Sequence, residues 1–169
     1  MTFDVLLRGG YLYDGSGHPG RPADVGLRGD CIAAVGDLSG GAARTEFDCS
    51  GLVVCPGFID LHSHSDLTLL TNPRAESAVH MGVTSECNGQ CGMGVFPVRP
   101  EHRAGLRACN SFIEAGQEYS WTSAAEYLER LRTAGPSLNV AQMVGHSALR
   151  AWALGFDNRP ATPEERRSM

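Results

Sequence analysis

The chain has 169 residues, 42% hydrophobic and 20% charged, with a formal net charge of −5; these values exclude low-complexity disorder, and the acidic balance argues against a nucleic-acid partner. All 14 basic residues are arginine, which excludes a lysine Schiff base and a carbamylated lysine bridging metals. No apolar run approaches the roughly 18 residues of a membrane span and the N-terminus lacks a signal-peptide pattern, so we expect a cytoplasmic protein without a membrane partner.

Residues 1–55 are predicted to form a small N-terminal β-domain. Short apolar runs, beginning with residues 3–8, alternate with glycine- and proline-rich turns. The segment Arg28-Gly29-Asp30 separates two such runs at a spacing that favours a tight hairpin. The region contains no helical pattern, and we expect it to be built of β-hairpins.

The pattern changes at Pro56-Gly57, and residues 56–169 are predicted to alternate strands with helices, which is typical of a parallel α/β architecture. The first strand, residues 58–61, is short and apolar and is expected to be buried. The other predicted elements are strands from residue 83 and over 139–144, and helices over 74–81, 100–116 and 123–134.

The last residues carry a strong helix start. Thr162 has the position of an N-cap, Pro163 of the first helical residue, and Glu165 closes a capping box. The chain ends at Met169, leaving about two turns, too few for a stable isolated helix. We expect a truncated chain, with a frayed polar tail as the alternative.

Six cysteines occur in a chain without a secretory pattern, so free thiols or metal ligands are expected rather than disulfides. Cys31, Cys49 and Cys55 are expected to pack as small buried hydrophobic side chains.

His62 and His64 follow the apolar strand directly and are two positions apart. On an extended strand such side chains share a face, so the two imidazoles can converge on one metal ion. Neutral imidazole suits zinc, and open sites with about three protein ligands are of the catalytic type. The alternative is a solvated polar strand end. The C-terminal end of a buried strand is where βα-barrel active sites lie, and this position favours a metal site over a solvated strand end.

Three segments together resemble the amidohydrolase superfamily and, within it, the N-acyl-D-amino-acid deacylases, or D-aminoacylases. They are PGFIDLHSH, GVTSECNGQCG and VGHSALR. The resemblance runs over almost the whole chain. It implies an α/β fold with a small N-terminal β-domain (residues 1–55), followed by the first strands of a TIM-like (β/α)8 barrel (residues 56–169). That barrel would be incomplete, because a full one needs about 250 residues.

The resemblance implies three metal ligands for Zn²⁺: His62, His64 and Cys91, the last replacing the carbamylated lysine of many relatives. A metal-bound thiol is deprotonated and supplies the anionic ligand. The spacing of Cys87 and Cys91 also fits a structural zinc knuckle, but no second ligand pair accompanies it. We therefore favour Cys91 as the ligand and Cys87 as a packed strand residue.

Four further residues near these motifs have open roles. By the resemblance His146 contacts substrate; alternatively it caps the next helix or meets a backbone carbonyl. Ser147 is a candidate helix N-cap. Asp66 either orients a ligand or is a solvated loop carboxylate. Glu86 departs from the family's usual apolar residue and, if buried, would need a partner.

The implied reaction is hydrolysis of an N-acyl-D-amino acid, a small-molecule substrate, to a D-amino acid and a carboxylate. The family's general acid/base aspartate and its middle-strand histidines are expected beyond Met169, so we predict no catalytic residue within this chain. The chain is therefore interpreted as an inactive, poorly soluble fragment of such an enzyme. The alternatives are a non-enzymatic metal- or partner-binding remnant and a cyclic-amide hydrolase of the dihydroorotase or hydantoinase type.

Overall fold

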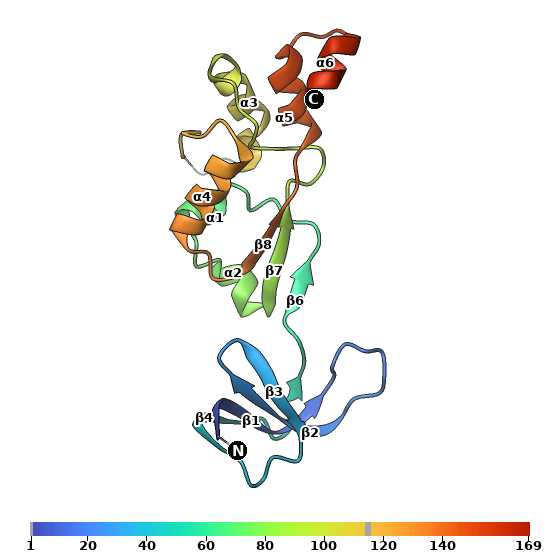
Figure 1. The fold of residues 1–169 in the computed structure, drawn as a ribbon, viewed down its shortest axis with the longest axis vertical. Coiled ribbons are helices and arrows are strands. Elements are labelled where there is room, and N and C mark those ends of the chain that lie inside the picture. The colour runs from blue at the N-terminus through green and yellow to red at the C-terminus, as the bar shows by residue number, and fades with distance from the viewer. Residues whose placement is uncertain (1, 114–115) are drawn as a thin grey trace. The chain divides into compact units, whose positions relative to one another are not determined.

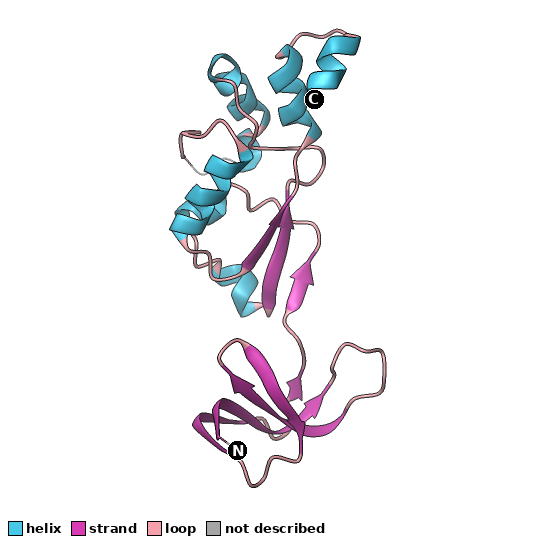
Figure 2. Ribbon diagram, viewed as in Figure 1, coloured by secondary structure: helices cyan, strands magenta, loops and turns pink. Residues whose placement is uncertain are grey.

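The computed structural model describes residues 2–113 and 116–169, and the chain separates into two compact units, Met1–Pro56 and Gly57–Met169. The first is all β and the second mixes helices with strands, as the colouring in Figure 2 shows. The division falls between Pro56 and Gly57, one residue after the expected boundary between residues 55 and 56.

The first unit is a five-stranded sheet. Its strands are β1 (Thr2–Leu12), β2 (Arg21–Arg28), β3 (Cys31–Gly36), β4 (Ala42–Asp48) and β5 (Val53–Val54). The order is β3-β2-β1-β4, and β5 also pairs with β1. The predicted hairpin is confirmed, because β2 and β3 pair antiparallel on either side of the Gly29-Asp30 turn. The expectation of hairpins throughout is wrong: β4 and β5 run parallel to β1, since the chain crosses from β3 to the opposite edge of the sheet.

Two glycines shape the first strand. The register of β1 against β2 shifts between Leu7 and Gly10, and Gly9 has φ +68°, a conformation that glycine adopts without steric cost. The strand therefore bends and continues instead of ending at the Gly-Gly pair. Leu12 and Val25 are buried in the small core of this unit.

The predicted burial of three cysteines is correct for only one of them. Cys49 is buried, whereas Cys31, at the start of the edge strand β3, and Cys55, after the end of β5, are exposed. All six cysteines are free thiols.

The second unit contains a three-stranded parallel sheet in the order β6-β7-β8, as Figure 1 shows. Its strands are β6 (Phe58–Asp60), β7 (Val83–Asn88) and β8 (Asn139–Gln142). Its α-helices are α1 (Thr68–Thr71), α2 (Glu76–His80), α3 (Arg103–Cys109), α4 (Ala124–Ala134), α5 (His146–Leu154) and α6 (Pro163–Ser168). Two 3-10 turns, η1 (Pro100–His102) and η2 (Ser111–Ile113), flank α3.

The core of this unit lies around aromatic side chains. Tyr119 and Trp121 stack with ring centroids 5.0 Å apart, and Trp121 donates its indole N–H to the carbonyl of Val95 at 2.7 Å.

The expectation that the first strand of this unit, β6, is buried is wrong for this chain. β6 is an edge strand, paired with β7 alone among the described strands, and Phe58 and Ile59 are 59% and 66% exposed.

Helix ends follow the sequence closely where a cap is present. Ser123 and Glu126 form the predicted capping box of α4, and Gly135 ends that helix in the left-handed conformation. Thr162 and Glu165 form the box of α6 in the same way. The helix predicted over 100–116 is instead interrupted at Asn110, whose buried side chain donates to the carbonyl of Gly94 at 2.9 Å. Residues 114 and 115 of that prediction lie outside the described residues.

None of the helices in the described part of the chain combines the length and apolar character that crossing a membrane requires.

Candidate metal centre

Three of the predicted side chains come together after the ends of β6 and β7. One ligand atom from each of His62, His64 and Cys91 lies within 4.8 Å of the others. His62 Nε2 is 3.1 Å from Cys91 Sγ. The centroids of the two imidazole rings lie 5.4 Å apart, and the ring planes meet at 71°. Among the residues that the structure describes, no other group of three or more His, Cys, Asp or Glu side chains meets in this way.

The two histidines reach this position from a loop and not from a strand. β6 ends at Asp60, whose carboxylate accepts a hydrogen bond from the backbone N–H of His62 at 3.0 Å. This local turn takes the chain out of the β-ladder. The expectation that His62 and His64 share one face of an extended strand is therefore wrong, although their rings still converge.

Cys91 follows β7 on a loop with unusual backbone geometry. Its φ is +57°, and Gly89 and Gly92 have φ values of +80° and +74°. A residue with a β-carbon in the left-handed region is held at a cost of about 1–3 kcal/mol and persists only where its surroundings fix it. Gly89 lies at a bend and Gly92 in a hydrogen-bonded turn, where glycine adopts a positive φ without steric cost. The backbone strain of this loop is thus located at Cys91, the predicted metal ligand.

Asp66 is held inside the unit. It is 1% exposed, its Oδ1 accepts from Gln142 Nε2 at 2.7 Å, and its carbonyl accepts from Tyr127 Oη at 2.8 Å. The alternative of a solvated loop carboxylate is therefore wrong. Burial, and then the nearby Asp66 charge, raise the pKa of Tyr127 far above its ordinary value, so the phenol keeps the proton that it donates.

Two buried polar residues of β7 contact the histidine loop, the segment of residues 61–65 that follows β6. Glu86 is 5% exposed, and the Ser63 hydroxyl donates to its carboxylate at 3.3 Å. Asn88 is fully buried, and its Oδ1 accepts from the backbone N–H of Ser65 at 3.1 Å. Glu86 thus has a hydrogen-bonding partner, as the sequence argument required of a buried carboxylate.

The remaining candidates stand outside the three-residue group. His146 is the exposed first residue of α5. Ser147 is not the N-cap, which is Gly145; its backbone N–H instead donates to the carbonyl of Gly92 at 2.7 Å and brings the start of α5 beside the Cys91 loop. Cys87 is partly buried on β7. The role of His146 in substrate contact stays a prediction.

The chemistry of the three donors fits a metal ion. Two imidazoles and one thiolate are ligands that zinc binds well, and three protein ligands leave a coordination position open. Nδ1 of His64 is buried and has no hydrogen-bond partner in the structure. A buried imidazole nitrogen without a partner is costly unless a ligand or an ion satisfies it. The residues present therefore fit a zinc ion.

Sequence reasoning did not identify the amide side chains around this group, Asn88, Gln90 and Gln142. Gln90 Nε2 donates to the carbonyl of Leu61 at 2.7 Å and to that of Cys87 at 3.3 Å. The position of Gln90 within the glycine-rich segment before Cys91 was the one available signal.

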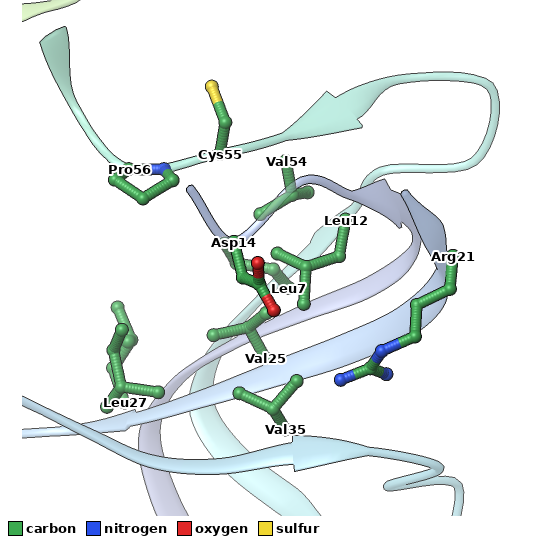
Figure 3. A pocket seen from close by; sticks show the side chains of 11 residues that line it. Leu7, Leu12, Asp14, Arg21, Val25, Leu27, Val35, Val54, Cys55 and Pro56 are labelled. Carbon is green, nitrogen blue, oxygen red and sulfur yellow. The ribbon is translucent and has the colours of Figure 1, made fainter. Parts of the chain in front are cut away.

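A separate hollow in the β unit has a different character. It measures about 420 Å³, and its lining is mainly apolar, with Asp14 and Arg21 as the charged residues (Figure 3). None of the three convergent residues lines it. It does not form part of the metal centre.

Comparison with known sequences places these residues in a family. The model of the family described as "Amidohydrolase family" matches residues 45–169. A D-aminoacylase of Alcaligenes xylosoxydans xylosoxydans is 46% identical over 165 residues, covering 98% of this chain and 34% of the relative. An N-acyl-D-glutamate deacylase of the same organism is 38% identical over 98% of this chain and 33% of its own length. The chain spans about a third of the length of these relatives.

Solved structures agree with the sequence relatives. A D-aminoacylase with a binuclear metal centre superposes with a TM-score of 0.88 at 43% identity, over 98% of this chain and 34% of that one. The N-acyl-D-glutamate deacylase of Bordetella bronchiseptica, complexed with zinc and a phosphonate inhibitor, superposes with a TM-score of 0.88 at 32% identity, over 99% of this chain and 35% of that one. The α/β fold with the opening strands of a barrel is thereby confirmed.

Proposed function

This chain belongs to the amidohydrolase family, and on that premise we propose that it supplies His62, His64 and Cys91 as ligands of the metal centre of an N-acyl-D-amino-acid deacylase. The observation that carries the proposal is the convergence of two imidazoles and a thiol within 4.8 Å. Relatives of the chain include a D-aminoacylase and an N-acyl-D-glutamate deacylase, and a solved structure of an N-acyl-D-glutamate deacylase holds zinc.

The proposed metal is zinc. A bound zinc ion lowers the pKa of a coordinated water to about 7 and polarises a carbonyl oxygen. His62 and His64 contribute neutral nitrogen ligands, so they leave the charge of the ion largely intact. Cys91 contributes the anionic ligand. Because this chain has no lysine, any anionic ligand that it supplies must be a cysteine or a carboxylate.

The proposed reaction is hydrolysis of a linear amide, in which an N-acyl-D-amino acid and water give a D-amino acid and a carboxylate. A D-hydantoinase from Thermus sp. superposes at 17% identity with a TM-score of 0.52, which shows the fold alone. The linear-amide relatives are 31–46% identical over nearly the whole chain. The comparison therefore favours a linear over a cyclic amide.

Metal binding tests the centre directly. Cobalt(II) replaces zinc as a spectroscopic probe, and a thiolate ligand gives it an intense near-ultraviolet charge-transfer band. We expect the 169-residue chain to bind one cobalt ion with that band, and Cys91→Ser to lose the band. The exposed Cys109→Ser variant is the control and should keep it. A band retained by Cys91→Ser would remove Cys91 from the ligand set.

A chimaera tests the activity. The first third of the Alcaligenes D-aminoacylase is replaced by this chain, which is 46% identical to it over that region. We expect the chimaera to hydrolyse an N-acyl-D-amino acid, and His62→Ala within it to lose that hydrolysis. A well-folded chimaera that binds zinc without turnover would favour the non-enzymatic remnant.

A further inference from the structure

We propose that Gln90 is a positioning residue, whose side-chain amide ties together the two loops that carry the metal ligands. The proposal rests on the zinc centre proposed above. It adds a residue that binds no metal itself and sets the distance between His62 and Cys91.

Gln90 links the two chain segments that precede His62 and Cys91. Its Nε2 donates to the carbonyl of Leu61, the residue before His62, at 2.7 Å. Gln90 is itself the residue before Cys91. One side chain therefore links the chain immediately before one proposed ligand to the chain immediately before another. His62 Nε2 and Cys91 Sγ lie 3.1 Å apart beyond this link.

The same amide closes its own loop. Gln90 Nε2 also approaches the carbonyl of Cys87 at 3.3 Å, and that carbonyl accepts the backbone N–H of Ser63 at 3.0 Å. The carbonyl of Cys87 is thus a junction between β7 and the histidine loop. Both protons of one amide group are used on backbone carbonyls, so loss of the amide leaves the Leu61 carbonyl without this donor and the Cys87 carbonyl with the Ser63 N–H as its remaining donor.

The strained backbone of Cys91 explains why such a tie is needed. Its φ of +57° is held only while neighbouring contacts fix the loop, and the Gln90 backbone carbonyl contributes by accepting the N–H of Met93 at 2.9 Å. The exposed Cys91 side chain has little packing to hold it. Without the Gln90 amide the loop is free to relax, and the thiol loses its fixed position beside His62.

The test compares Gln90→Met, which keeps the length of the side chain and removes its hydrogen bonds, with Gln117→Met. Gln117 also donates from its Nε2 to a backbone carbonyl, that of Leu67, in the same unit and outside the ligand group. Cobalt affinity is measured by competition with a chelator. We expect Gln90→Met to bind cobalt about 10–100-fold more weakly, the usual effect of removing a group that orients ligands, and Gln117→Met to bind within about twofold of the wild type.

A second readout needs no metal. Hydrogen exchange of the metal-free chain is followed for the backbone amides of residues 61–65 and 88–92. We expect these to exchange faster in Gln90→Met and in Gln90→Glu, whose carboxylate has no proton to donate, while the amides of α4 keep their rates. Faster exchange throughout the unit would indicate general destabilisation and would contradict a local tie.

The outcomes separate the two proposals. Wild-type chain that binds cobalt, together with Gln90→Met that binds it equally well, overturns the role of Gln90 and leaves the metal centre standing. Wild-type chain that binds no cobalt overturns the metal centre and this role with it. Weaker binding in Gln90→Met with locally faster exchange supports both.

Discussion

His62 Nε2 lies 3.1 Å from Cys91 Sγ, although 29 positions separate the two residues in the chain. The contact arises because β6 and β7 are neighbouring parallel strands, so the loops that follow them begin at the same edge of the sheet. In βα-barrels this edge carries the active site, because the loops after the strands converge there. The strand pairing therefore decides which distant residues meet.

The isolated chain is expected to hydrolyse no amide even when it is loaded with zinc. Within the described residues the convergent group contains two histidines and a cysteine but no carboxylate to transfer protons. An assay with N-acetyl-D-methionine should show the rate of buffer alone. Turnover that disappears in His62→Ala would show instead that this chain suffices for catalysis.

Gly89→Ala is expected to lower the free energy of unfolding by at least about 2 kcal/mol. Gly89 has φ +80°, and an added β-carbon would lie 2.3 Å from the carbonyl oxygen of Met143. Urea unfolding measures the change. Gly135→Ala is the matched control, because φ there is +69° and nothing lies within 4 Å, so only the backbone cost of about 1 kcal/mol remains. Equal losses in both variants would contradict the steric argument.

Tyr127→Phe is expected to cost about 1–3 kcal/mol of stability. The variant removes the hydroxyl that donates to the Asp66 carbonyl at 2.8 Å and leaves a buried acceptor without this partner. Urea unfolding followed by the fluorescence of the two tryptophans reports the change. Tyr13→Phe, at a side chain that is 48% exposed, should change stability by less than about 0.5 kcal/mol. A similar effect at both positions would mean that the buried bond adds nothing.

The start of α6 is expected to weaken in acid. The Arg159 guanidinium, and then the backbone N–H of Thr162, lower the pKa of Glu165 from its ordinary value of 4.5 to about 2. Because the folded pKa lies below the unfolded one, the stabilisation is complete above about pH 4.5 and is lost as the pH falls towards 2. Carboxyl NMR titration measures the pKa directly. In Arg159→Gln it should move back towards 4.5, and an unchanged value would exclude the ion pair as the cause.

Ile59→Lys is expected to reduce self-association of the isolated chain. Ile59 is 66% exposed on the edge strand β6, and a lysine on an edge strand discourages pairing with another copy. Sedimentation at several concentrations measures the association. Leu128→Lys on α4, at a side chain that is 44% exposed, adds the same charge away from the strand edge. If both variants reduce association equally, net charge and not the edge is responsible.

Local signals in the sequence were sufficient wherever neighbouring residues decide the structure. The capping boxes at Ser123 and Thr162, the stop at Gly135 and the hairpin turn after Arg28 all depend on contacts within a few residues. The family resemblance and the choice of His62, His64 and Cys91 also came from short motifs. Such features require no knowledge of which distant segments pack together.

Tertiary structure alone decided the features that depend on long-range pairing. The residue pattern of β4 is compatible with parallel or antiparallel pairing, and only its place beside β1 in the fold makes it parallel to that strand. An apolar strand such as β6 is normally covered, yet its burial depends on neighbours, and at the edge of this sheet Ile59 is exposed. The ties of Gln90 to Leu61 and of Gln142 to Asp66 span 29 and 76 positions. An amide side chain has no periodicity that reveals its partner, because hydrogen bonds are made between groups that the fold, and not the chain order, brings within about 3 Å.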